Sequence, residues 1–418
     1  MATRERVEAD FDHQSLEWLA ERHSHNDELR AKCPVVWNSR YRGFWFVAGY
    51  DEVRAVAQDS ATFTPRFEES SPDGLRYIGI MGVPRREGMP PVGIAEAEGV
   101  RHAVLRRLLN PFMLPPAVAG LRPFMEAAAT WFMDQRIEAG SMDVVLDFTN
   151  PVPAVLTMKM IGLPCESWGH YAEFFHATAA YGEDMLEYQT AVARVPEMVA
   201  ELIEIAEQRR HDPKGDILSE LVTVEIGGHR LSNDDVVAIL WNLIGGGLDT
   251  TTSLTSLALH DLAGHPELRQ RLIEDLDLLL PACEEYLRWT SVNETLTRTC
   301  TRDTELGGQL IKRGDFVMMS WLGANFDPAV FDRPHDVIID RAPNPHLSFG
   351  VGTHRCIGLH LARSLFMVMM KEVLTRIPDY SVDGEATQFY QGNPELYGIV
   401  RMPVTFTPGA KVGGPRPF

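Results

Sequence analysis

Apolar positions recur at every third or fourth residue over much of the chain. This spacing is typical of helices that bury one face. The pattern predicts helices over residues 50–58, 121–142, 196–210, 217–224, 233–262 and 358–376. The run Asp212-Pro213-Lys214-Gly215-Asp216 separates two of them, because Pro and Gly interrupt helices. The chain is therefore expected to be mainly helical.

Short β-type runs accompany the helices. The runs 35–37 and 43–47 are rich in Val, Phe and Trp, which favour strands. Residues 305–311 followed by 314–319 predict a β-hairpin with a glycine turn. The stretch 325–352 reads as irregular and 379–418 as strand and loop. We expect one domain over residues 1–418, mainly α with small β-sheets, with a β-rich lobe near 35–50, 300–320 and 380–410.

Composition and charge narrow the function classes. The 418 residues are 45% hydrophobic, which suffices for a large core. The net charge of −19 argues against binding nucleic acid, which needs a basic surface, and is explained by solubility. The N-terminus is polar, and no apolar run approaches the ~20 residues of a membrane span, so neither signal peptide nor anchor is expected. Five widely spaced cysteines without a CxxC pair indicate a reducing compartment, hence the cytoplasm.

The strongest chemical signal is the segment 346–363, HLSFGVGTHRCIGLHLAR. Gly350 and Gly352 permit positive φ and let the backbone approach a flat ligand. Cys356 precedes a predicted helix, whose free N–H groups favour a thiolate over a thiol. Gly358 leaves room beside the sulfur. A thiolate held in this way is a good axial ligand for iron.

Two other interpretations compete at this segment. A single cysteine is often an inert core residue. His354, Cys356 and His360 could instead form a zinc cluster, although zinc sites usually show paired ligands such as CxxC and no second pair is near. The length and specificity of the whole pattern favour the iron ligand.

The segment Phe349–Arg363 resembles the haem-binding loop of soluble bacterial cytochrome P450 proteins. The family's pattern of Phe, two Gly, His, Cys, Gly and Ala-Arg is filled without a gap, and the resemblance extends from about Phe46 to Phe406. It implies a triangular helical prism, haem b (iron protoporphyrin IX) as the cofactor, and Cys356 as the metal ligand. It also assigns Phe349, Gly350 and Gly358 to cofactor binding.

The predicted helix 233–262 contains three consecutive glycines, Gly245 to Gly247. Each costs about 1 kcal/mol relative to Ala, so a reason is needed. Close helix packing is one reason, and a kink that leaves space for O₂ is another. Thr250 could hold the kink by bonding to the carbonyl of Gly246. The resemblance implies a catalytic acid–alcohol pair of Asp249 and Thr250, although Thr251 and Thr252 make the register ambiguous.

The run Glu285-Tyr-Leu-Arg288 is similar to the family's Glu-x-x-Arg signature. Residues three apart share a helix face and can pair. A surface ion pair would contribute little, whereas the family pair is buried and grips the irregular stretch before the Cys loop. The family often has Arg after the Pro of that stretch, but here His335 follows Pro334. Arg341 is therefore the candidate for the third member.

Haem propionates need cationic donors, and four positions match the family's: His102, Arg106, Arg298 and His354. His102 and Arg106 share one helical face at i and i+4. Arg106 could also belong to a solvent face with the adjoining Arg107. The approach to His102 departs from the family's usual Asp-Pro-Pro-Glu-His, so the loop there can differ in shape.

By family position, the substrate pocket is apolar and rich in methionine, which suits a flexible hydrophobic guest, although some members could be core residues. Its expected members are Ile78, Ile80, Met81, Met89, Val92, Tyr181, Met185, Leu243, Gly246, Val292, Thr295 and Leu396. A terpenoid, fatty-acyl or steroid-like substrate would fit.

The resemblance implies a monomeric monooxygenase that inserts one oxygen atom of O₂ into an apolar small molecule. Electrons would come from a ferredoxin and its NAD(P)H-dependent reductase, because no flavin or iron–sulfur module is recognised. The ferredoxin would dock on arginines and a lysine, namely Arg106, Arg107, Arg355, Arg363 and Lys371. A peroxide-driven peroxygenase would be expected to lack the proton relay, and a haem-based sensor or carrier would not need it.

Overall fold

The computed structural model describes residues 6–86, 89–392 and 394–418. The chain forms two compact units. The first comprises Met1–Ala103, Glu284–Cys356 and Pro394–Leu396, and the second Val104–Cys283, Ile357–Asn393 and Tyr397–Phe418. The chain passes between them within α4 (Gly99–Met113), within α13 (Leu279–Thr290), directly after Cys356, and on either side of the segment Pro394–Leu396.

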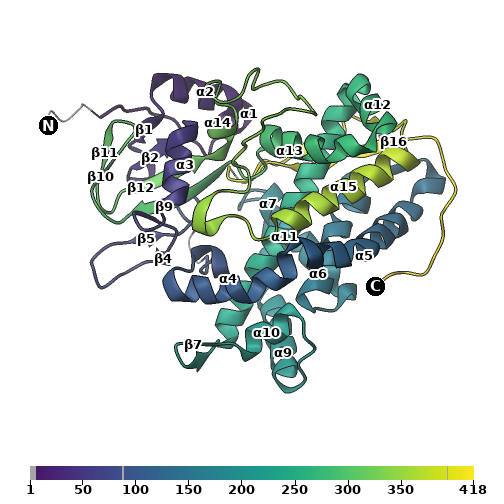
Figure 1. Cartoon of the computed structure of the whole chain (residues 1–418), viewed down its shortest axis with the longest axis horizontal. Coiled ribbons are helices and arrows are strands. Elements are labelled where there is room, and N and C mark those ends of the chain that lie inside the picture. Colours follow the sequence, from purple (N-terminus) through teal and green to yellow (C-terminus); the bar gives the residue numbers. More distant parts are fainter. Residues whose placement is uncertain (1–5, 87–88, 393) are drawn as a thin grey trace. The chain divides into compact units, whose positions relative to one another are not determined.

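A five-stranded sheet forms the centre of the first unit, in the order β1-β2-β12-β9-β3 (Figure 1). Its strands are β1 (Val35–Asn38), β2 (Phe44–Val47), β12 (Phe316–Ser320), β9 (Thr295–Cys300) and β3 (Phe63–Thr64). β2 and β12 run parallel, whereas the other neighbours are antiparallel. Successive side chains of a strand enter two different apolar clusters, since they point to opposite faces: Trp45 and Val317 lie in one, Phe46 and Met318 in the other.

Short elements complete the first unit. Its helices are α1 (Leu16–Ala20), α2 (Arg22–Lys32), α3 (Tyr50–Gln58) and α14 (Trp321–Asn325), with the short helices η1 (Arg40–Arg42), η2 (Gly93–Glu96) and η7 (Gly352–His354). Two hairpins pair β4 (Phe67–Glu68) with β5 (Tyr77–Ile78), and β10 (Thr304–Leu306) with β11 (Gln309–Ile311). α14 packs against both α2 and α3.

The second unit is built around the long helix α11 (Asn233–Gly264), which packs against α6, α7, α9 and α15 (Figure 1). Ser232 and Asp235 form a capping box that satisfies free N–H groups at its first turn. The other helices are α5 (Pro115–Asp134), α6 (Pro151–Ile161), α7 (Trp168–Ala180), α8 (Leu186–Val192), α9 (Val195–His211), α10 (Ile217–Thr223), α12 (Pro266–Glu274), α15 (Leu359–Arg376), η3 (Ile137–Ala139), η4 (Val145–Thr149), η5 (Cys165–Ser167) and η6 (Leu276–Leu278).

The small sheets of the second unit collect strands from distant parts of the chain. One has the order β13-β16-β6 and joins Ser381–Val382, Pro403–Thr405 and Ser141–Asp143. The others pair β14 (Gln388–Phe389) with β15 (Ile399–Arg401), and β7 (Glu225–Ile226) with β8 (His229–Arg230). The strands between residues 380 and 410 therefore pair within the second unit, and those near 35–50 and 300–320 within the first.

The predicted class, mainly α with small β-sheets, is confirmed. Two element predictions were wrong. The helix expected over 121–142 ends at Asp134, and Gly140, with φ +69°, turns the chain into strand β6. The expected hairpin of 305–311 with 314–319 is instead a hairpin within 304–311, because β12 joins the large sheet between β2 and β9.

Candidate functional site

The loop predicted to bind the cofactor belongs to the first unit up to Cys356 and to the second unit from Ile357 onward. The backbone N–H of Cys356 donates to the carbonyl of Phe349 at 2.8 Å, which closes the loop. Gly350 and Gly352 have φ of +64° and +75°, a region that side chains rarely adopt. A Cβ on Gly352 would lie 3.0 Å from the carbonyl oxygen of Ala57, so the loop lies close to the end of α3. Cys356 is exposed.

A side chain of α14 and a backbone carbonyl of α13 anchor the start of this loop. The Oδ1 atom of Asn325 accepts from the backbone N–H of Leu347 at 2.7 Å, and its Nδ2 donates to Ser348 Oγ at 2.9 Å. Ser348 Oγ donates in turn to the carbonyl of Leu287 in α13 at 2.6 Å. Sequence reasoning did not identify Asn325 or Ser348, because both act through contacts with distant backbone.

Glu285 and Arg288 form an ion pair with both side chains fully buried. Arg288 also donates to the carbonyls of Asn325, Pro334 and Asp336 at 3.1, 2.7 and 3.0 Å. These bonds tie α13 to the irregular stretch that precedes the Cys loop.

Arg341 is the third member of this network. Its Nε lies 3.0 Å from Glu285 Oε2, and its side chain is 7% exposed. The backbone N–H of Ile338 and the Nδ2 atom of Asn344 also donate to Glu285, at 2.9 and 3.1 Å. Arg341 thus supplies the arginine that the family often has after the Pro, where this chain has His335.

Three of the four expected propionate donors lie in the first unit. The rings of His102 and His354 are 4.4 Å apart between centroids, and His102 is buried. Arg298 is also buried, and burial lowers its pKa to about 10, so it stays cationic at neutral pH. Its Nη1 donates to the carbonyl of Thr297 at 2.7 Å. Arg106 is half-buried on α4, one turn beyond His102, in the part of that helix that belongs to the second unit.

The three glycines of α11 have different surroundings. A Cβ on Gly245 would lie 2.6 Å from the ring of Phe175, and one on Gly247 would lie 2.8 Å from Thr157 Oγ1, so close packing explains both. At Gly246 a Cβ would meet no heavy atom of the described residues within 4 Å. Thr250 Oγ1 donates to the carbonyl of Gly246 at 2.9 Å, as predicted. The helix is continuous through this segment.

Asp249 is buried and bound by two residues that sequence reasoning missed. His176 Nδ1 lies 3.0 Å from Asp249 Oδ1, and the Tyr390 hydroxyl donates to Asp249 Oδ2 at 2.6 Å. His176 lies on α7, and Tyr390 follows β14. No local motif connects the three positions, since 73 and 141 residues separate His176 and Tyr390 from Asp249.

The residues expected to line a substrate pocket are divided between the units. In the first unit, the backbone N–H of Thr297 donates to the carbonyl of Ile80 at 3.0 Å, and Asn293 forms a β-bridge with Leu396. These contacts bring together the segments that carry Ile78, Ile80, Val292, Thr295 and Leu396. Glu96 links Val92 to the same place, because its carboxylate accepts from the backbone N–H groups of Ile80 at 2.9 Å and Val92 at 2.6 Å. In the second unit, Tyr181 ends α7, Met185 precedes α8, and Leu243 and Gly246 lie on α11.

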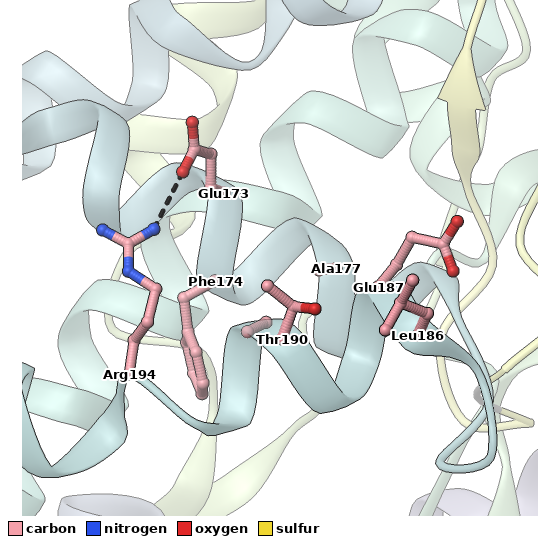
Figure 2. A pocket seen from close by; sticks show the side chains of 8 residues that line it. Glu173, Phe174, Ala177, Leu186, Glu187, Thr190 and Arg194 are labelled. Carbon is pink, nitrogen blue, oxygen red and sulfur yellow. Dashed lines mark hydrogen bonds and ion pairs between the residues drawn. The ribbon is translucent and has the colours of Figure 1, made fainter.

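A surface groove of about 310 Å³ lies between α7 and α8 in the second unit (Figure 2). Phe174, Ala177 and Leu186 give it an apolar wall, and Arg194 Nη1 lies 2.9 Å from Glu173 Oε2 at its edge. Tyr181 and Met185, the residues expected to line a pocket in this region, do not line this groove.

Residues 6–86, 89–392 and 394–418 contain neither a cluster suited to a metal ion nor a helix suited to crossing a membrane. No three or more His, Cys, Asp or Glu side chains there are arranged to hold a metal ion, which leaves the zinc interpretation of His354, Cys356 and His360 without support. Among the same residues, no helix combines the length and apolarity needed to cross a membrane.

Comparisons with known proteins agree with these features. The sequence model of the family Cytochrome P450 matches residues 166–383. The chain is 32% identical over 349 residues to a steroid C26-monooxygenase of Mycolicibacterium smegmatis, covering 82% of this chain and 84% of that protein.

Two solved structures are similar over nearly the whole chain. Cytochrome P450 CYP268A2 of Mycobacterium marinum, in complex with pseudoionone, gives a TM-score of 0.85 at 27% identity and covers 97% of this chain and 100% of its own. P450BioI, in complex with an acyl carrier protein that bears hexadec-9Z-enoic acid, gives a TM-score of 0.80 at 25% identity. This match covers 93% of this chain and 100% of the P450BioI chain. The chain belongs to the cytochrome P450 family, whose members bind haem b, and it is a cytochrome P450 monooxygenase.

Proposed function

We propose that this enzyme inserts one oxygen atom of O₂ into a terpenoid, fatty-acyl or steroid-like molecule. Cys356 is the proposed iron ligand, and Asp249 with Thr250 the proposed proton relay. When bound, haem b supplies the iron at which O₂ is activated, and a thiolate ligand favours O–O cleavage. The observation that carries the proposal is the closed, glycine-containing loop that presents an exposed Cys356.

The described residues fit haem b. Gly350 leaves open space, since a Cβ there would come no closer than 3.9 Å to Trp321, which suits the approach of a flat ring. His102, His354 and Arg298 supply donors that can bind two propionates, and the Arg298 guanidinium is cationic at neutral pH. Arg106 is the proposed fourth donor, and Phe349 and Gly358 are proposed to shape the site around the sulfur.

Thr250 can hold a proton-carrying hydroxyl in one place. Its hydroxyl donates to the carbonyl oxygen of Gly246, with 2.9 Å between Oγ1 and that oxygen. The lone pairs of Oγ1 therefore remain available to accept a second hydrogen bond. Asp249 is the neighbouring acid that can supply protons to this position. A peroxygenase or an oxygen carrier has no need of this pair, so the pair supports monooxygenation.

Four observations support an apolar substrate. The expected lining residues are mostly apolar, and several are methionines, which adapt to flexible guests. One relative is named for a steroid, and one similar structure holds pseudoionone, a terpenoid-type ketone. Another similar structure holds a fatty acyl chain on its carrier protein.

We infer that electrons reach the enzyme from a ferredoxin with an NAD(P)H-dependent reductase, and that it works in the cytoplasm as a monomer. Family members use separate redox partners, and an acidic ferredoxin could dock at the basic side chains of Arg106, Arg107, Arg355, Arg363 and Lys371. Five cysteines at wide spacing support a reducing compartment.

The test combines binding with isotope-labelled turnover. The ferric enzyme is titrated with pseudoionone, hexadec-9Z-enoic acid and cholest-4-en-3-one, and the Soret band is followed. Compounds that shift the band are then turned over with NADH, ferredoxin and reductase under ¹⁸O₂. We expect a product with one heavy oxygen atom, and a much lower yield when unlabelled H₂O₂ replaces the electron chain. No Soret shift with any of the three would refute the substrate class, and efficient turnover by H₂O₂ alone would favour a peroxygenase.

A further inference from the structure

His176 belongs to a buried polar network that surrounds Asp249 within the second unit. His176, Asp249, Ser253 and Tyr390 are 7%, 3%, 0% and 5% exposed, so each needs hydrogen-bond partners inside the protein. Ser253 Oγ donates to the Tyr390 hydroxyl at 3.5 Å, and Tyr390 donates to Asp249. A Cβ on Gly398 would lie 2.3 Å from Ser253 Oγ, so the backbone on the other side of the network is tightly packed as well.

The hydrogen bonds of His176 define where its protons lie. Its Nε2 is 2.8 Å from the carbonyl oxygen of Val400, which can only accept, so Nε2 carries a hydrogen. Its Nδ1 is 3.0 Å from Asp249 Oδ1 and 3.2 Å from the Tyr390 hydroxyl. The Tyr390 hydrogen is already committed to Asp249 Oδ2 at 2.6 Å, so Nδ1 faces two acceptors. One further proton therefore belongs on the line between Nδ1 and Oδ1.

The surrounding charges favour keeping that proton on the ring. Burial alone would lower the pKa of His176, but the hydrogen bond and charge of Asp249 outweigh it, and the pKa is raised above its ordinary value of 6.5. Asp143 on β6 adds to this effect, and Arg401, 3.6 Å from Asp143, opposes it in part. Burial and Asp249 together raise the pKa of Tyr390 well above its ordinary value, so Tyr390 stays neutral.

We propose that His176 stores on Nδ1 the proton that Asp249 passes on, and that His176 is thereby the positioning residue that sets the pH dependence of proton delivery. This inference rests on the proposed role of Asp249 and Thr250. In the step, the Nδ1–H bond breaks and an O–H bond forms on Asp249 Oδ1, which leaves a neutral imidazole and a neutral carboxyl. Asp249 passes this proton on and returns to the carboxylate, and His176 then takes up one proton from solvent hydronium, so the pair ends with the charges with which it began.

The first test needs no substrate. Holoenzyme with isotope-labelled histidine is studied by NMR in the diamagnetic ferrous–CO form, and the resonance missing in His176→Gln identifies His176. We expect the pKa of His176 to lie above its ordinary value of 6.5. In Asp249→Asn, burial without the carboxylate should lower its pKa below 6.5, whereas His170, exposed on the same helix, should not change. A pKa of His176 at or below 6.5 in the wild type would overturn the proposal.

The second test measures the product formed per NADH consumed between pH 6 and 9. The substrate is whichever of the panel compounds, namely pseudoionone, hexadec-9Z-enoic acid and cholest-4-en-3-one, shifts the Soret band. The wild-type ratio should fall several-fold as pH rises through the pKa found by NMR. The ratio in His176→Gln should be low and independent of pH, whereas His170→Gln should follow the wild type.

The outcomes separate this inference from the proposed function. If Asp249→Asn and Thr250→Ala retain the wild-type ratio, the relay itself is wrong. If both lower the ratio while His176→Gln keeps the wild-type pH profile, the relay stands and His176 has no part in it. If no panel compound binds, the substrate class fails, and the NMR titration still decides whether His176 holds the proton.

Discussion

Arg288 binds Glu285 through two hydrogen bonds, from Nη2 to Oε1 at 2.8 Å and from Nε to Oε2 at 2.9 Å, and neither side chain is exposed. Arg341 adds a second cation to the same carboxylate. Buried charges of this kind are tolerated only when every partner is present. The network therefore connects α13 to the stretch before the Cys loop in an arrangement that depends on all three side chains.

Removal of either member of the pair should destabilise the protein strongly. Glu285→Ala or Arg288→Ala leaves a buried charge without its partner, at a cost of about 3–5 kcal/mol in the free energy of unfolding. We expect little soluble holoprotein from either variant. Arg122→Ala is the control, because its ion pair with Glu126 is about half exposed and should contribute less than about 1 kcal/mol. Normal yield and denaturation midpoint in both buried variants would show that the pair does not support the fold.

His13 should make the protein sensitive to mild acid. It is 3% exposed between the rings of Tyr41 and Phe44, and burial lowers its pKa to about 4. In the unfolded chain this histidine binds a proton near pH 6.5, whereas in the folded chain it does not. The contribution of neutral His13 to the free energy of unfolding is therefore fully present above pH 6.5 and is lost as pH falls towards 4. The loss between pH 7 and pH 5 should be about 2 kcal/mol.

His13→Phe provides the comparison, since it removes the titrating group and keeps a ring of similar shape. Urea denaturation at each pH gives the free energy of unfolding of both proteins. The difference between wild type and variant should change by about 2 kcal/mol between pH 7 and pH 5. A constant difference from pH 7 to pH 5 would mean that His13 does not titrate as described.

Thr250→Ala should separate electron uptake from product formation. The helix tolerates Ala, so folding, haem content and substrate binding should stay close to wild type. Loss of the hydroxyl should instead divert most of the consumed NADH to H₂O₂. Thr251→Ala is the control, because Thr251 is buried and its hydroxyl is not assigned to the relay. Full coupling in Thr250→Ala would refute the acid–alcohol assignment, and uncoupling in Thr251→Ala alone would shift it by one residue.

Arg107→Glu should slow reduction by the ferredoxin several-fold at low ionic strength. Arg107 is exposed on α4, and a basic group can steer an acidic partner and raise the association rate. The effect should shrink as salt is added, since salt screens exposed charges. Arg230→Glu, an equal change of charge on the exposed β8, is the control. Equal reduction rates in the two variants would remove Arg107 from the docking surface.

Much of the fold follows from local sequence patterns. The apolar spacing predicted α3 over the residues that form it and α11 to within two residues of its end. α3 buries one face, and the first half of α11 buries residues at helical spacing, whereas α11 is buried on all sides from Thr251 to Leu259. The error after Asp134 has a different origin. Strand β6 forms only because Met142 pairs with Val404, a partner far along the chain that no local pattern reveals.

The residues of the candidate site likewise fall into those that local sequence patterns predict and those that they do not. Cys356 and Thr250 lie in compact motifs, so their residue types and spacing suffice to propose a role for each. His176 and Tyr390 reach Asp249 only through the packing of α7 and the tail of the chain around α11. A histidine within an amphipathic helix gives no sign of such a role, so only the three-dimensional structure could reveal the network.

The account depends most on Cys356 as the iron ligand, and the CO-treated spectrum of the reduced protein tests this most directly. The wild type should show the thiolate-type band. Cys356→Ala should lose it, and Cys356→His should bind haem with the band of an imidazole ligand, because the variant replaces a charged sulfur by a neutral nitrogen. Cys300→Ala and Cys283→Ala, which alter buried cysteines, should keep the wild-type spectrum. A thiolate-type band that persists unchanged in Cys356→Ala would contradict the assignment and place the ligand at another cysteine.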